Sequence, residues 1–177
     1  MTTAREKLKE FVRQLGADRR DTWAAIHNRE KPAASFDVFS NLYPDEAHFL
    51  FELLQNAEDA RACEVSVQLS RKGCIFSHNG TPFNEEDIES ITSIGVSSKK
   101  NDETKIGVYG LGFKSVYSYT DTPTIRSGEV SFFLEEKMIP VLMENGPKLD
   151  TETIIEIPFG SGSVGQKKHY SEISERL

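Results

Sequence analysis

The amino-acid sequence predicts an α+β fold in which a β-sheet carries helices on one face. Helical periodicity dominates the first third of the chain, and strands and helices alternate through the middle. Short β-prone runs, broken by Gly, Pro and Asp, occupy the last third. Helices and strands distributed in this order favour a sheet whose helices gather on one side.

The bulk composition is that of one globular domain. The chain has 177 residues, of which 37% are hydrophobic, enough to build a core. Its formal net charge of −7 disfavours direct binding of nucleic acid by this domain. There is no apolar run of the roughly 20 residues that cross a bilayer, and the N-terminus lacks the apolar segment of a signal peptide. We therefore expect a cytoplasmic protein without a membrane partner.

The first 35 residues are expected to form an N-terminal helical segment. Apolar side chains recur at helical spacing in residues 3–15, and Gly16 is a plausible helix stop. Residues 21–28 predict a second short helix, and residues 30–35 form a connector. Pro44 and the two acidic residues after it suit the first turn of the next helix.

Residues 49–61 predict an amphipathic helix, because apolar side chains recur on one face and neither Gly nor Pro interrupts them. Glu52 and Asn56 lie one turn apart on the opposite face, and Asp59 lies about a turn further along. Taken alone, this polar stripe is either a solvated surface or part of a site.

Two β-prone runs follow this helix. Residues 63–69 alternate as a half-buried strand does, and residues 73–77 supply its hairpin partner. Cys63 and Cys74 lie in these runs, and we expect buried, reduced thiols. A turn at residues 71–73 would pair Cys63 with a residue well beyond Cys74, which argues against a disulfide.

The middle of the chain predicts a helix and a loop. Asn84 is placed to cap a helix with an acidic first turn, and Ile88, Ile91 and Ile94 supply its buried side. Residues 95–104 are polar and aperiodic, as in a mobile loop. Further strands are indicated at residues 124–126, 130–134 and 153–159, before a charged, helix-compatible tail at residues 161–177.

The glycine-rich run at residues 107–115 precedes a helix-compatible segment, an arrangement that presents backbone N–H groups to phosphate. It is not a P-loop, because Phe113 separates Gly112 from Lys114 and a polar loop precedes the run where a P-loop has a buried strand. It also lacks the third glycine of the dinucleotide fingerprint.

Four motifs occur in order: ELLQNAEDA at 52–60, HNGTPF at 78–83, SIGVSSKK at 93–100 and IGVYGLGFKSVY at 106–117. Together they resemble the GHKL ATPase superfamily of gyrase B, heat-shock-90 chaperones, histidine kinases and MutL, and within it the sacsin-type, chaperone-like branch. The resemblance spans residues 43–159. It implies a Bergerat-type fold, a two-layer sandwich of a mixed, mainly antiparallel sheet with helices on one face, with residues 36–160 as the nucleotide-binding domain.

The resemblance also implies roles for individual residues. Glu52 matches the general base that activates water, and Asn56 matches the residue whose amide oxygen binds Mg²⁺. Residues 94–105 match the lid over ATP, including Ser97, Ser98 and Lys99. The implied nucleotide-binding positions are Asp59, His78, Asn79, Gly80, Gly107, Gly110, Leu111, Gly112, Phe113, Lys114, Ser115 and Thr153. Asp59, Lys114 and Thr153 also have plain interpretations, as a helix-surface charge, an exposed lysine and a structural strand threonine.

One position departs from the superfamily pattern. His78 stands where relatives have the aspartate that accepts a hydrogen bond from the adenine amino group, and Pro82 replaces a glycine. A neutral imidazole accepts through one nitrogen, and Asn79 offers an amide oxygen, but neither equals a buried carboxylate. Alternatively, His78 is a partly buried histidine at a strand end.

The leading hypothesis is a magnesium-dependent module that binds ATP, hydrolyses it slowly and drives a conformational change in a larger protein. The alternative is a nucleotide- or ligand-binding module without turnover, and a purely structural domain ranks third. Expected partners are following domains of a longer chain, a partner protein, or a second copy in a nucleotide-dependent dimer. Chaperone-like remodelling, a nucleic-acid-linked machine and a defence or signalling switch all remain open.

Overall fold

The structure, a computed structural model, describes residues 3–28, 48–93, 112–160 and 163–177. The expected start of a helix at Pro44, the polar loop at residues 95–104 and the lid residues Ser97, Ser98 and Lys99 lie outside these ranges. So do Gly107, Gly110 and Leu111.

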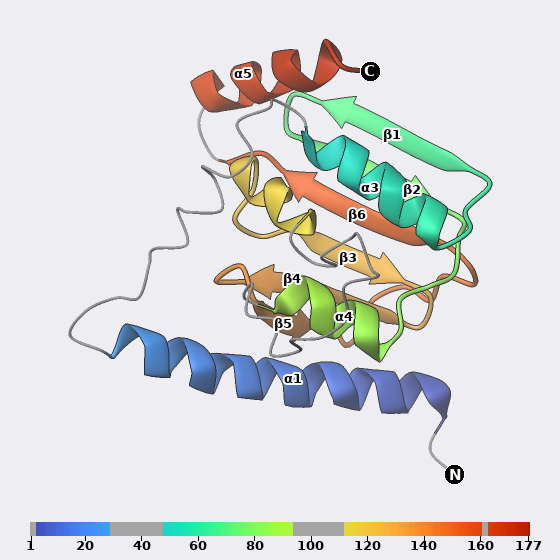
Figure 1. Ribbon diagram of the computed structural model, residues 1–177, viewed down its shortest axis with the longest axis vertical. Helices are drawn as coiled ribbons and strands as arrows, with labels where there is room; N and C mark the ends of the chain where they lie inside the picture. The colour runs from blue at the N-terminus through green and yellow to red at the C-terminus, as the bar shows by residue number, and fades with distance from the viewer. Residues whose placement is uncertain (1–2, 29–47, 94–111, 161–162) are drawn as a thin grey trace, which may run out of the picture.

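The N-terminal segment is one continuous helix, α1 (Ala4–His27), with Thr3 as its N-cap. The expected stop at Gly16 is therefore wrong. Gly16 is required by packing, because a Cβ at this position would lie 2.5 Å from the carbonyl oxygen of Pro140 in the edge strand β5 (Ile139–Leu142). The missing side chain lets α1 lie along the β4–β5 edge of the sheet (Figure 1).

Within the described ranges, the sheet has six strands in the order β1-β2-β6-β3-β4-β5. The five pairings between them are all antiparallel. The remaining strands are β1 (Val65–Ser70), β2 (Gly73–His78), β3 (Thr124–Ser127), β4 (Val130–Glu135) and β6 (Thr153–Pro158). All but β5 coincide with β-prone runs of the sequence, and β5 is a strand that the sequence pattern did not indicate.

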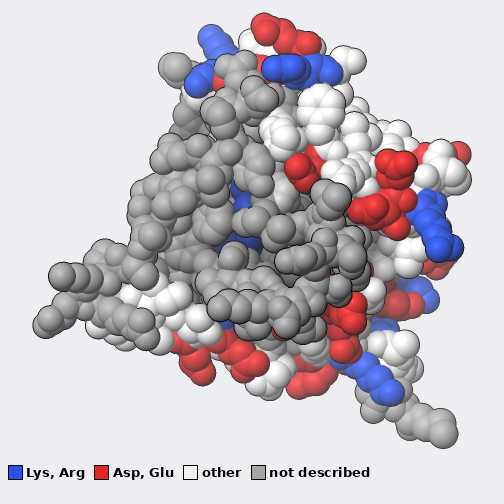
Figure 2. Space-filling view, in the orientation of Figure 1, with Lys and Arg blue, Asp and Glu red and all other residues white. Residues whose placement is uncertain are grey.

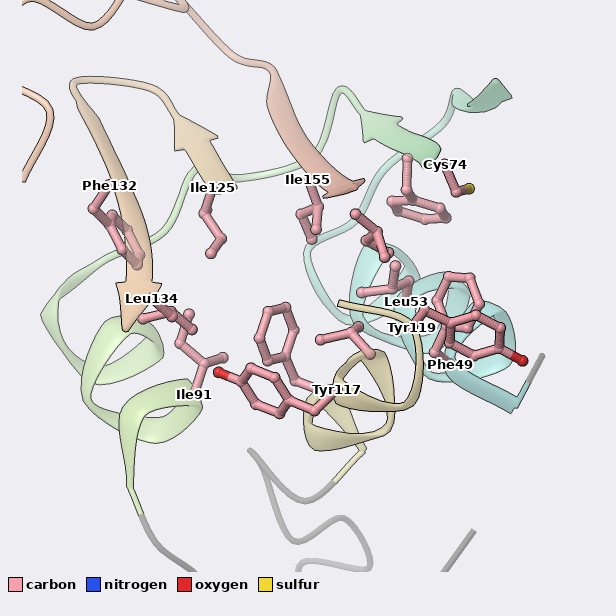
Figure 3. Close-up of a cluster of buried hydrophobic side chains, with 14 of the residues drawn as sticks. Phe49, Leu53, Cys74, Ile91, Tyr117, Tyr119, Ile125, Phe132, Leu134 and Ile155 are labelled. Atoms are coloured by element: carbon pink, nitrogen blue, oxygen red, sulfur yellow. The ribbon is translucent and has the colours of Figure 1, made fainter. Parts of the chain in front are cut away.

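Among the described helices, three lie over one face of this sheet (Figure 1): α3 (His48–Asp59), α4 (Glu85–Thr92) and the 3₁₀ helix η1 (Phe113–Ser118). The core lies between the two layers, where Phe49 and Leu53 of α3, Ile91 of α4 and Tyr117 of η1 meet the apolar side chains of the strands (Figure 3). The α+β architecture with helices on one face is confirmed.

One row of side chains shows how the core is ordered. Phe76, Ile155, Ile125 and Phe132 are paired neighbours on four adjacent strands, and each is almost fully buried. Paired residues of antiparallel strands point to the same face, so the row forms a continuous apolar floor beneath the helices.

Helix α4 begins as the sequence predicts. The Asn84 side chain accepts a hydrogen bond from the Asp87 N–H, and the Asp87 carboxylate accepts one from the Asn84 N–H. This reciprocal capping box fixes the entry of the chain into α4.

The charged tail forms a helix, α5 (Ser163–Ser174), which contacts β1 at the opposite edge of the sheet from α1 (Figure 1). In the described parts of the chain, no helix combines the length and apolarity that a membrane crossing needs.

Both cysteines are free thiols. Cys74 is buried, and burial raises the pKa of its thiol to about 11. The expectation of burial is wrong for Cys63, which is exposed because it lies in the turn ahead of β1 rather than within the strand.

Candidate functional site

The candidate base Glu52 lies on α3 beside Gly112, the N-cap residue of η1. A Cβ at Gly112 would lie 1.9 Å from Oε2 of Glu52, so the two backbones can approach only because residue 112 is a glycine. The other carboxylate oxygen, Oε1, is 3.1 Å from Nε2 of His48, one turn earlier on the same helix. Sequence reasoning missed His48, although its i,i+4 spacing to Glu52 was a signal.

A pocket of about 240 Å³ opens next to this contact, between α3 and α4. Three of the residues that the sequence assigned to a nucleotide site line it: Asn56, Asp59 and Phe113. The others that line it are Ala60, Thr81, Phe83, Asn84, Asp87, Ser90 and Ile91. Glu52 does not line the pocket, but lies one helical turn before Asn56 on the same helix.

The pocket has a mixed polar and apolar lining that includes two acidic side chains. Asp59, the last residue of α3, and Asp87, in the first turn of α4, both line it. Acidic side chains gather over both helix ends (Figure 2). Among the described residues there is no cluster of three or more His, Cys, Asp or Glu side chains that would enclose a metal ion. Mg²⁺ is usually held by only one or two protein oxygens together with substrate phosphates, and the Asn56 amide suits that chemistry.

The turn after β2 is tied to the C-terminal end of α3. The Asn79 Oδ1 accepts hydrogen bonds from the N–H groups of Cys63 and Glu64, each at 3.0 Å. A Cβ on Gly80 would lie 2.7 Å from the carbonyl oxygen of Ala60. Both lone pairs of the Asn79 amide oxygen are therefore used within the protein, so this oxygen is not available to accept a hydrogen bond from the adenine of a nucleotide.

His78 is buried at the end of β2, with its side chain 4% exposed. Its Nδ1 accepts a hydrogen bond of 3.1 Å from the N–H of Gly80. Burial lowers the pKa of the imidazole, which favours the neutral ring. The one nitrogen through which a neutral ring accepts is thus already paired.

Thr153 is the neighbour of His78 on β6 and of Ser127 on β3. It is fully buried, and its Oγ1 lies 2.6 Å from the Oγ of Ser127. Ser127 in turn accepts a hydrogen bond of 2.8 Å from the N–H of Phe83, a residue that lines the pocket. Beyond the apolar row of the sheet, the same face therefore ends in a polar row of His78, Thr153 and Ser127.

Lys114 and Ser115 are not among the residues that line the pocket. The Lys114 Nζ donates to the carbonyl oxygens of Ile91, at 2.5 Å, and Lys137, at 3.1 Å. Burial, assisted by the charge of Arg19, lowers the pKa of Lys114 to about 7. The interpretation of Lys114 as an exposed lysine is wrong, since it is 4% exposed. Ser115 Oγ donates to the carbonyl of Gly112 at 2.6 Å.

The sacsin domain family matches residues 66–154, half of the chain. The chain belongs to this family. Its matched region runs from β1 to the first residues of β6, and so includes the turn at His78, helix α4 and η1.

Curated relatives of this sacsin-domain chain are much longer proteins. It is 34% identical over 119 residues to sacsin from Homo sapiens, covering 56% of the chain and 3% of sacsin. It is 35% identical over 96 residues to the protein NO VEIN from Arabidopsis thaliana, covering 51% of the chain and 4% of that protein. The chain is also 28% identical over 116 residues to the DNA mismatch repair protein MutL from Aquifex aeolicus, and this match covers 62% of the chain and 27% of MutL.

Among solved structures, the N-terminal domain of a DNA repair protein superimposes with a TM-score of 0.55 over 78% of the chain and 43% of that structure. The sequence identity is 17%, so this similarity describes the fold. The sequence matches to the sacsin domain and to MutL, by contrast, relate the chain to the GHKL ATPases.

Proposed function

We propose that this chain is a magnesium-dependent nucleotide-binding module that hydrolyses a purine nucleoside triphosphate slowly, with residues 36–160 as the nucleotide-binding domain. ATP is the nucleotide that the family relationship implies. The observation that carries the proposal is the contact between Glu52 and Gly112, which brings the candidate base from α3 against the glycine segment, next to the pocket of Asn56 and Asp59.

Glu52 has the properties of a general base in this arrangement. One carboxylate oxygen is held by His48, and the other lies against Gly112, so the carboxylate has a defined position rather than a free rotamer. A positioned carboxylate next to a pocket can accept a proton from water as the water attacks phosphorus. His48 is a positioning residue for this group.

The phosphate and metal end of the site is assigned to Asn56. Its amide lines the pocket one turn after Glu52, so a magnesium ion held there with the phosphates would lie close to the base. Bound magnesium would neutralise charge on the phosphates, which a pocket lined by Asp59 and Asp87 does not do by itself. Ser97, Ser98 and Lys99 are proposed as lid residues.

The test compares phosphate release from ATP with Mg²⁺ by the chain and by two variants of α3. Glu52→Gln removes the base and keeps the shape of the side chain, whereas Glu58→Gln makes the same change on an exposed residue of the same helix. We expect Glu52→Gln to lower the rate roughly 100-fold or more and Glu58→Gln to leave it unchanged. Equal rates in all three proteins would refute the hydrolase proposal.

A second candidate function is nucleotide binding without turnover. It is favoured by the turn at His78 and Asn79, whose accepting atoms are already paired within the protein. Calorimetry with ADP and a non-hydrolysable ATP analogue separates the two candidates, because this function predicts binding that Glu52→Gln does not weaken and no phosphate release. Absence of heat with every nucleotide would contradict both.

We propose that nucleotide binding and hydrolysis drive a conformational change that is passed to other domains. The chain spans only 3% of sacsin and 4% of NO VEIN, so its relatives carry this region within far longer chains. Following domains, a partner protein or a nucleotide-dependent second copy would receive the change.

A further inference from the structure

We propose that helix α5 acts as a clamp on the candidate site, and that His169 of α5 and Tyr119 at the end of η1 are positioning residues for Glu52. The docked helix keeps α3 and η1 together where Glu52 meets Gly112, and its release slows hydrolysis. The inference rests on the proposed function, because the contact that α5 holds is that of the candidate base.

One tyrosine ring joins three elements of the fold. Tyr119 is the C-cap residue of η1, and it is 7% exposed. The centroid of its ring lies 4.9 Å from that of Phe49 on α3 and 4.8 Å from that of His169 on α5. Tyr119 and Phe49 lie side by side in Figure 3. Aromatic rings at these separations attract each other beyond the effect of buried area, so α3, η1 and α5 share one packing centre.

The contact between Phe49 and Tyr119 joins the same two elements that meet at the candidate base. Gly112 and Tyr119 are the N-cap and C-cap residues of η1. Each of them touches α3, the first at Glu52 and the second at Phe49, and these two residues lie about one turn apart on α3. A short helix that is held at both ends cannot pivot. Loss of the contact at Tyr119 therefore frees Gly112 to move away from Glu52.

Helix α5 supports Tyr119 through His169. The His169 ring meets Tyr119 edge-on, and its centroid lies 5.6 Å from that of Phe159, the residue after β6. Nδ1 of His169 is 3.4 Å from Oε2 of Glu172 on the same helix, which fixes the orientation of the ring. One turn further along α5, Ile173 is fully buried in the hydrophobic core. His169 and Ile173 therefore hold α5 against the domain.

Helix α5 can leave its seat while the sheet stays folded. Of the α5 side chains that the structure describes, only that of Ile173 is fully buried. Strand β6, which precedes α5, is paired with β2 on one side and β3 on the other, so the pairing of the sheet does not depend on α5. Elements with few buried contacts open at a lower free energy than the whole domain. A domain or partner protein that binds α5 would therefore change hydrolysis from outside the pocket.

The clamp acts on turnover and not on the binding of nucleotide. None of the described residues that line the pocket belongs to α5. An interaction that only positions the base contributes to the transition state and not to the bound ground state. Loss of the clamp should therefore lower the turnover rate and leave the nucleotide affinity nearly unchanged.

The test measures phosphate release from saturating ATP with Mg²⁺ by the 177-residue chain and by three variants of α5. His169→Ala removes the ring, His169→Phe keeps a ring at the same place, and Lys167→Ala changes an exposed residue of the same helix. We expect His169→Ala to lower the rate at least about fivefold and to keep the dissociation constant for ADP within about twofold. The other two variants should stay close to the original chain in both quantities.

A second readout needs no turnover. In nitrogen-15 NMR of the nucleotide-free chain, the backbone N–H resonance of Gly112 reports whether this residue still lies against Glu52. We expect the resonance to shift or broaden in His169→Ala and to keep its position in His169→Phe and Lys167→Ala. Ile173→Val makes a smaller change at the same seat and should move the resonance by less, and it replaces His169→Ala if that variant does not fold.

The outcomes separate the two proposals. If the original chain releases phosphate and His169→Ala does so at the same rate, hydrolysis stands and the clamp is overturned. If the original chain releases none, the hydrolase proposal fails, and the Gly112 resonance still decides whether α5 holds the contact, since an unmoved resonance overturns the inference. An equal loss of rate in Lys167→Ala would also overturn it, because Lys167 lies outside the ring contacts.

Discussion

Gly112 lies so close to Glu52 that a single methyl group on its Cα would overlap the carboxylate, with only 1.9 Å between the added carbon and Oε2. The backbone at Gly112 has φ −61° and ψ −45°, which any residue can adopt. The glycine is therefore needed for the contact and not for its backbone conformation.

Gly112→Ala is expected to displace the Glu52 carboxylate and to lower phosphate release roughly tenfold or more, because a misplaced base loses most of its effect. The melting temperature should change little, since the end of a glutamate side chain can move. Gly160→Ala is the matched control, because a Cβ at Gly160 would meet nothing within 4 Å. An unchanged rate in Gly112→Ala would show that the carboxylate position is irrelevant to turnover.

Gly16→Ala is expected to destabilise the chain although alanine favours helices. The exchange improves the helix propensity of α1 by about 1 kcal/mol, but its methyl group would lie 2.5 Å from the Pro140 carbonyl oxygen and push α1 off β5. Gly165→Ala in α5, where a Cβ meets nothing within 4 Å, should stabilise. Urea unfolding measures both, and stabilisation by both exchanges would contradict the observed packing of α1 on β5.

Lys114 makes the stability of the chain depend on pH in a defined direction. Its pKa is about 7 in the folded chain, compared with 10.5 for an unperturbed lysine. Between these values the unfolded chain binds the extra proton, so the free energy of unfolding rises as the pH increases from about 7 to about 10.

Lys114→Met removes this contribution. The stability of the original chain relative to the variant should increase over the same interval, as measured by urea unfolding at about pH 7 and about pH 10. Lys72→Met, on an exposed lysine of the β1–β2 turn, serves as the control and should show no such trend. A constant difference between Lys114→Met and the original chain would mean that Lys114 keeps an ordinary pKa.

Asn79 is expected to contribute to stability rather than to base recognition. Asn79→Ala leaves the N–H groups of Cys63 and Glu64 without their acceptor and should cost about 1–3 kcal/mol in thermal or chemical unfolding. Asn79→Asp keeps an acceptor at the same place and should recover most of the loss. If Asn79→Ala instead weakens nucleotide binding without any loss of stability, the amide contributes to base recognition and not to stability.

Most of the fold was predictable because local chemistry decides it. Asn84 and the acidic residues after it, including Asp87, identify the start of α4. The alternation of apolar and polar residues identifies the first strand of the β1–β2 hairpin. Gly16 was misread because a glycine that ends a helix and one that packs against another backbone look the same in a sequence. Strand β5 was missed because it has four residues, one of them Pro140, and is defined by its pairing with β4.

The positions of the candidate site residues on helix α3 were predictable from the sequence, whereas the hydrogen-bond partners of Lys114 and His78 were not. Spacing on α3 put Asn56 and Asp59 on one face, and both line the pocket. No pattern shows that the Lys114 ammonium turns inward to the carbonyls of Ile91 and Lys137, because that choice depends on acceptors far along the chain. The tautomer of His78 likewise depends on one backbone N–H, that of Gly80.

The strand order has a consequence for how the protein is made. Among the described strands, the β1–β2 hairpin and the β3–β4–β5 meander are joined only through β6, which follows the other five strands in the sequence. Until Thr153 has been synthesised, His78 and Ser127 belong to two separate pieces of sheet. A chain interrupted before residue 153 therefore contains the candidate base Glu52 and the proposed metal-binding amide of Asn56, yet lacks the strand that unites its sheet.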